Sequence, residues 1–156
     1  MKDLGVLKSF LGVEVACRYE VRYLKGSPGQ GLLVSSACDL SLTGWCDSDS
    51  AGCPVTRRSI TGWIVFFGGS PISWKTKKQH TVSRYSAEAE YRSMAAITVE
   101  LKWLKALSLD FGDGTLWTTH VSTEVQLADI FTKGLGKTKF HYLLRKLGVS
   151  FLPTPT

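Results

Sequence analysis

The chain has 156 residues, of which 44% are hydrophobic and 21% are charged, enough for one domain with a buried core. It lacks both the long apolar run of a membrane span and the layout of a signal peptide, so we expect an intracellular protein, cytoplasmic or nuclear. The net charge of +6 favours a polyanionic partner such as nucleic acid, although charge alone does not decide this.

The first forty residues predict little regular structure. Residues 4–16 are expected to form one or two short strands, and residues 26–31 have the composition of a linker. A further short strand is expected over residues 31–35. The four cysteines have no zinc-binding spacing and are expected to be free, partly buried thiols: Cys17, Cys38, Cys46 and Cys53.

Three antiparallel strands are predicted next. The first ends at Asp47 and is followed by a turn-like run over residues 48–52. The second, residues 59–67, is apolar on both faces, so we expect it to be covered on both sides. A tight turn at Gly68 and Gly69 leads into the third strand, residues 71–75.

Helices dominate the rest of the chain. A long helix is predicted from Ser86, its N-cap, to about residue 109, with its apolar spacing running through Tyr91. A second helix is predicted through residues 124–133, capped by Ser122 or Thr123, and a short basic helix over residues 140–147. Lys133 and Lys139 are expected to add to a basic surface.

Carboxylate residues lie at or near the ends of several of these predicted elements. Asp47 ends a strand, Glu90 lies in the first turns of the long helix, and Asp129 lies in the later helix, with His120 before it. Carboxylates brought together in this way suit a divalent-metal site that activates water against a phosphodiester. Asp49 and Glu88 are expected to be structural.

Several runs of sequence carry a family resemblance: residues 45–49, 57–62, 68–79, 86–91 and 126–135. They resemble the ribonuclease H domain of copia-type LTR retrotransposon polyproteins, and residues 1–16 resemble the end of the reverse-transcriptase palm in the same polyproteins. The resemblance implies an α/β (mixed α+β), incomplete ribonuclease H-like fold, with antiparallel strands packed on a long helix and an N-terminal strand remnant. It divides the chain into a reverse-transcriptase C-terminal remnant (1–25), a linker (26–42), a partial ribonuclease H-like domain (43–148) and a flexible tail (149–156).

The resemblance also implies roles for residues. Asp47, Glu90 and Asp129 match the catalytic carboxylates that hold Mg²⁺, with Mn²⁺ as a substitute, and that cut the RNA strand of RNA–DNA hybrids; His120 is a looser match to a loop histidine. The expected partner is RNA–DNA hybrid or another nucleic acid, and neither a membrane nor a small-molecule cofactor is expected. The oligomeric state is left open. Six basic residues are expected to contact it: Arg57, Arg58, Lys75, Lys77, Lys78 and Arg84.

One block of the family pattern is missing. The strand with a further catalytic Asp, between the long helix and the last catalytic helix, looks deleted. Asp110 and Asp113 are not expected to replace it, because a helix running to residue 109 places residue 110 about 30 Å from Glu90. The strand ending in Asp47 should therefore have an unpaired edge, bare or patched, with residues 10–15 as one candidate.

Three functional hypotheses stay open. The chain could be a residual hybrid-specific ribonuclease that binds Mg²⁺ weakly. It could be a catalytically inactive relic that still binds nucleic acid, or a pseudogene product without a selected role. Because catalytic groups that act as a unit fail together, we favour little or no cleavage.

Overall fold

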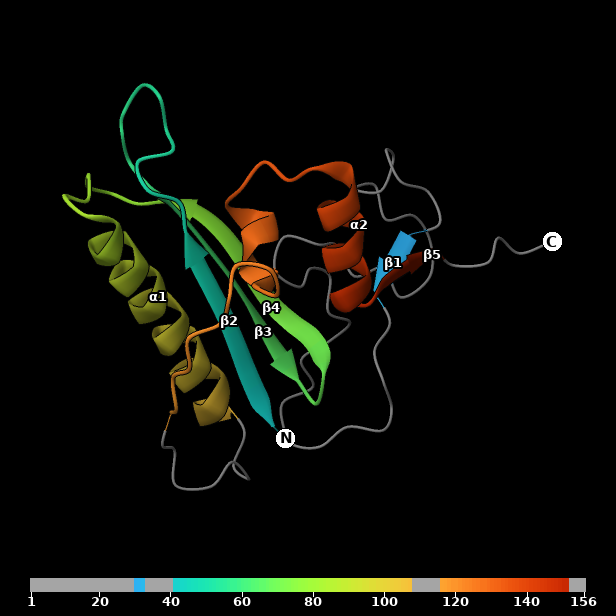
Figure 1. Ribbon diagram of the computed structural model, residues 1–156. Helices are drawn as coiled ribbons and strands as arrows, with labels where there is room; N and C mark the ends of the chain where they lie inside the picture. Colours follow the sequence, from blue (N-terminus) through green and yellow to red (C-terminus); the bar gives the residue numbers. More distant parts are fainter. Residues whose placement is uncertain (1–29, 33–40, 108–115, 152–156) are drawn as a thin grey trace, which may run out of the picture.

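The computed structural model describes residues 30–32, 41–107 and 116–151 (Figure 1). Residues 1–25, including the strand expected near 10–15, lie outside that part. Its elements give a mixed α/β architecture, and no helix within it is long and apolar enough to cross a membrane. In chain order these elements are β1 (Gln30–Leu32), β2 (Leu42–Ser48), β3 (Ile60–Phe67), β4 (Ser70–Lys78), α1 (Ser86–Leu107), the 3-10 helix η2 (Leu127–Phe131), α2 (Lys137–Lys146) and β5 (Val149–Phe151).

The central sheet has three antiparallel strands in the order β2-β3-β4. The turn between β3 and β4 uses Gly68 and Gly69 with φ of 52° and 79°, the left-handed backbone that glycine adopts without strain. The predicted strands and turn are therefore confirmed.

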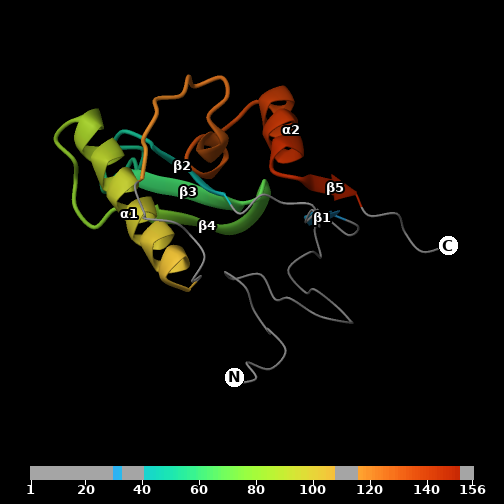
Figure 2. The same cartoon turned by 90° about the horizontal axis from the view of Figure 1, so that it is seen from below.

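Strand β3 is covered on both faces, as its two apolar faces predict. On one face Trp63 and Val65 pack with Ile97 of α1. On the other, Ile64 and Phe66 pack with Leu147, which follows α2. The sheet thus lies between α1 and the pair formed by η2 and α2 (Figures 1 and 2).

Helix α1 follows the predicted apolar spacing only in part. Leu101 and Leu104 pack against the core, as that spacing predicts. The buried residues are Ala89, Ser93 and Ile97, whereas Tyr91 is 69% exposed. The reason is a close approach to β2, where a Cβ built on Gly44 would lie 2.6 Å from Ile97 Cδ1. Small side chains on the helix and a glycine on the strand let the two backbones come this close.

The segment before α2 also differs from the prediction. In place of a helix over residues 124–133, the chain forms the five-residue 3-10 helix η2. Its cap is Gln126, whose Oε1 accepts a hydrogen bond from the Ala128 N–H at 3.2 Å, rather than Ser122 or Thr123. The Gln126 side chain also donates through Nε2 to the Cys46 carbonyl at 3.1 Å, which ties the start of η2 to β2.

The end of the chain was expected to be a flexible tail, but Val149–Phe151 forms β5. It pairs antiparallel with β1, so that Gln30 lies opposite Phe151. Strand β1 lies within the expected linker, residues 26–42, and overlaps the short strand predicted over residues 31–35.

Strand β2 is an edge strand, as expected if its neighbour is missing. In the described residues it pairs with β3 and with no other strand. One side chain from elsewhere occupies part of its outer backbone, since Gln126 Nε2 donates to the Cys46 carbonyl. The edge is therefore patched at this point by a side chain.

Gly62 sets how closely η2 can lie on the sheet. A Cβ there would lie 2.6 Å from Phe131 Cβ and 2.7 Å from Thr132 Cγ2. We expect Gly62→Ala to lower the free energy of unfolding by about 1–3 kcal/mol in urea titrations, because η2 must shift. Gly134→Ala is the control, since a Cβ there meets nothing within 4 Å. Equal stability of the Gly62→Ala and parent proteins would contradict this seating of η2.

Candidate carboxylate site

Asp47 lies near the end of β2, on the sheet face that carries η2. It is paired in register with Gly62, on which Phe131 and Thr132 are seated. Its Oδ2 accepts a hydrogen bond from the Thr132 hydroxyl, and its Oδ1 lies 3.3 Å from Lys133 Nζ. The residues just after η2 therefore hold this strand end.

Asp129 lies within η2 and its side chain is fully buried. Its Oδ1 lies 2.5 Å from Lys133 Nζ, and its Oδ2 lies 2.7 Å from Nζ of Lys139 on α2. One ammonium, that of Lys133, therefore bridges Asp47 and Asp129. Burial opposes the charge of Lys133, but the hydrogen bond to Asp129 and the charges of both carboxylates outweigh burial and raise the Lys133 pKa.

Glu90 lies on the exposed side of α1, directly after the buried Ala89. Glu90 is close enough to the end of β2 to influence the Cys46 thiol. Burial is the main cause that raises the Cys46 pKa, and a hydrogen bond with Ser93 opposes it. The negative charges of Asp47 and Glu90 raise this pKa further. Yet none of the ion pairs within the described ranges joins Glu90 to Lys133 or Lys139, the two lysines that contact Asp47 and Asp129.

His120 is exposed in the segment before η2. No hydrogen bond or ion pair of the described residues links it to either aspartate. The catalytic roles of Glu90 and His120 stay predictions.

The carboxylate pair does not fit a divalent metal as it is arranged. Mg²⁺ takes an octahedral set of oxygen ligands. All four carboxylate oxygens of Asp47 and Asp129 already face Thr132, Lys133 or Lys139. Over the described ranges no three His, Cys, Asp or Glu side chains form a group that could hold a metal ion, and no buried side-chain polar atom lacks a partner. Asp110 and Asp113 lie outside those ranges.

Asp49 and Glu88 are structural, as predicted. Asp49 Oδ1 accepts a hydrogen bond from the Ile60 N–H at 2.5 Å, which closes the loop between β2 and β3. Glu88 pairs with Arg92 at 2.6 Å and accepts a hydrogen bond from the Arg84 N–H at 2.7 Å, so it secures the start of α1.

The two lysines are the site residues that sequence reasoning missed, since it placed both on a basic surface. Lys133 had a local signal, because it follows Asp129 by four residues, the spacing of an ion pair along a helix. Lys139 had none, because it reaches Asp129 only through the packing of α2 beside η2.

The six basic residues expected to contact nucleic acid are all exposed, and none takes part in a salt bridge of the described region. Sheet register relates them to the carboxylates: Asp47 lies opposite Gly62, which lies opposite Thr76, between Lys75 and Lys77. Two strand spacings, about 10 Å, therefore separate Asp47 from this part of β4. The end of β2, the end of β4 and the start of α1 lie at one end of the sheet (Figure 1).

Lys78 has a further contact in the loop between β2 and β3. Its Nζ lies 3.1 Å from Cys53 Sγ. Hydrogen bonds with Thr56 and with Lys78 lower the Cys53 pKa to about 6. Cys46 and Cys53 are both free thiols, as predicted.

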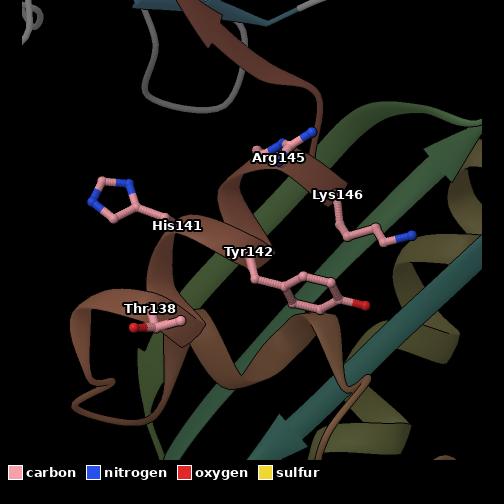
Figure 3. Close-up of a pocket in the computed structure, with 5 residues that line it drawn as sticks. All are labelled: Thr138, His141, Tyr142, Arg145 and Lys146. Atoms are coloured by element: carbon pink, nitrogen blue, oxygen red, sulfur yellow. The ribbon is translucent and has the colours of Figure 1, made fainter.

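A hollow of about 610 Å³ lies along the outer side of α2 (Figure 3). The hollow is on the side of α2 away from the buried Leu143. Within it, the Lys146 ammonium makes a cation–π contact with Tyr142, with Nζ 5.8 Å from the centre of the ring. It shares no residue with the carboxylate pair. Its lining residues are Thr138, His141, Tyr142, Arg145 and Lys146.

Comparison with known proteins finds relatives by sequence alone, since no family model and no solved structure matches. The retrovirus-related Pol polyprotein from transposon RE1 of Arabidopsis thaliana is 33% identical over 177 residues, covering 85% of this chain and 12% of that protein. The uncharacterized mitochondrial protein AtMg00810 of the same plant is 48% identical over 55% of this chain and 36% of its own length. The Pol polyprotein from transposon TNT 1-94 of Nicotiana tabacum is 36% identical over 70% of this chain and 8% of its own length.

The chain thus spans about an eighth of the transposon RE1 polyprotein. The alignment extends over 177 residues but includes only 85% of the 156 residues of this chain. Several tens of its positions therefore have no counterpart in this chain.

Proposed function

This chain belongs to the family of retrovirus-related Pol polyproteins from copia-type transposons, and from that premise we propose that residues 43–148 are a partial ribonuclease H-like domain. The domain binds RNA–DNA hybrid or other nucleic acid and cleaves it little or not at all. One observation carries this proposal: Asp47 and Asp129, distant in sequence, meet at one ammonium, two strands away from the exposed lysines of β4.

Metal has a minor part in this proposal. Asp47, Glu90 and Asp129 are the positions at which the family resemblance places Mg²⁺, or Mn²⁺ in its place, and the lysine contacts of the two aspartates oppose that binding. The chain's own contribution is to bind the hybrid backbone through exposed lysines and arginines, and a catalytic role of His120 is the looser part of the proposal. The expected intracellular location belongs to the same proposal.

Hybrid binding should depend steeply on salt, because each phosphate contact releases counterions. We expect fluorescence anisotropy with a labelled RNA–DNA hybrid to show weaker binding by the Lys75→Gln/Lys77→Gln variant, with the slope of log K against log salt reduced by about two. A matched control is Lys102→Gln/Lys105→Gln, near the other end of α1.

Two results would contradict the proposal. The parent protein could show no salt-dependent binding to hybrid or duplex, which would favour a product without a selected role. The control variant could lose as much affinity as Lys75→Gln/Lys77→Gln, which would place binding outside the end of the sheet that carries Asp47.

A further inference from the structure

We propose that the Lys133 ammonium takes the place of a divalent cation between Asp47 and Asp129, so that the pair is closed to metal until this charge is removed. The inference rests on the proposed function in taking these two aspartates as the site. It adds an internal cation that decides whether metal can enter.

The contacts place Lys133 in a bridging position. Its Nζ lies 2.5 Å from Asp129 Oδ1 and 3.3 Å from Asp47 Oδ1. The second oxygen of each aspartate faces another donor, Lys139 Nζ at 2.7 Å or the Thr132 hydroxyl. An arriving cation would therefore have to displace at least one protein donor from each carboxylate.

Charge balance points the same way. Two carboxylates and two ammonium groups make a cluster that is neutral in sum. A divalent ion added to it would lie within a few ångströms of two like charges, which repel it. The carboxylate of Asp129 is fully buried, and side chains of Lys133 and Lys139 that are only about a third exposed cover its two oxygens.

The local backbone holds this arrangement ready. The Lys133 N–H donates to the Asp129 carbonyl at 2.9 Å, so the ammonium stays tethered one turn from its partner. A tethered charge acts at a high effective concentration, whereas Mg²⁺ must come from solution. Gly62 completes the geometry, because its missing side chain lets Thr132 reach Asp47.

The test is metal binding by the full chain, with Mn²⁺ as the probe and electron paramagnetic resonance to count the free ion. Lys133→Met removes the bridging charge, and Lys137→Met removes an exposed lysine that makes no ion pair in the described region. We expect Lys133→Met to bind Mn²⁺ about tenfold or more tightly than the parent, and Lys137→Met to match the parent. Parent binding as tight as that of Lys133→Met, or an equal gain in Lys137→Met, would overturn the inference.

A second measurement does not depend on the variant folding. In the parent protein, the side-chain carboxyl ¹³C signals of Asp47 and Asp129 are followed by NMR as Mg²⁺ is added. Unchanged signals at millimolar Mg²⁺ are the expected result, and joint saturable shifts would overturn the inference. Neither measurement uses nucleic acid, so loss of hybrid binding would count against the proposed function alone.

Discussion

Replacing Asp129 with alanine is expected to lower the free energy of unfolding by about 2–4 kcal/mol, measured by urea titration with tryptophan fluorescence. The change removes the buried carboxylate that joins Lys133 to Lys139 and leaves a cavity in η2. The estimate lies below the range for a wholly buried pair because both lysines are about a third exposed, so each can turn toward water.

Glu124→Ala is the control for this change. Glu124 is exposed in the turn just before η2 and takes part in no salt bridge of the described residues, so its removal should alter stability by less than about 0.5 kcal/mol. Equal unfolding midpoints for Asp129→Ala and Glu124→Ala would mean that the lysine-bridged pair contributes nothing to the fold.

Leu143→Ala is expected to cost about 2–5 kcal/mol, because the leucine is fully buried and its removal leaves a cavity under α2. The substitution should also weaken the contact between Lys139 and Asp129, because Lys139 lies on α2. The neighbouring Tyr142→Ala, at a side chain that is 43% exposed, should cost clearly less in the same urea titration. A larger loss for Tyr142→Ala would show that α2 packs through its other face.

Much of the sheet could be predicted because the sequence features that specify its strands and turn lie within the strands and the turn themselves. The two apolar faces of β3 require cover on both sides, and paired glycines allow the turn into β4. The unpaired edge of β2 was predictable only from the resemblance, since a missing neighbour leaves no mark on the strand itself.

Only part of the buried face of α1 could be predicted from apolar spacing. Leu101 and Leu104, two residues of that spacing, pack against the core, whereas Tyr91 of the same spacing is 69% exposed. The residues that meet the sheet include Ala89 and Ser93, whose small size matters more than their hydrophobicity because Gly44 lets the backbones approach closely. The spacing of apolar residues along a helix carries no information about how closely the helix backbone approaches a strand.

The candidate site was predictable in part. The resemblance gave Asp47 and Asp129, and the structure brings both to Lys133. The role of Lys139 depends on how α2 packs beside η2, which no local pattern encodes. Gln126 was missed as the cap because glutamine, unlike Ser or Thr, is not among the residues preferred at the N-cap of a helix.

The most direct test of the central claim is hydrolysis of an RNA–DNA hybrid labelled on its RNA strand, in Mg²⁺, by the parent protein and by Asp47→Asn. If Lys133 closes the carboxylate pair, both proteins should release the same background level of product. Cleavage by the parent that Asp47→Asn abolishes would contradict the account and establish a working ribonuclease at this site.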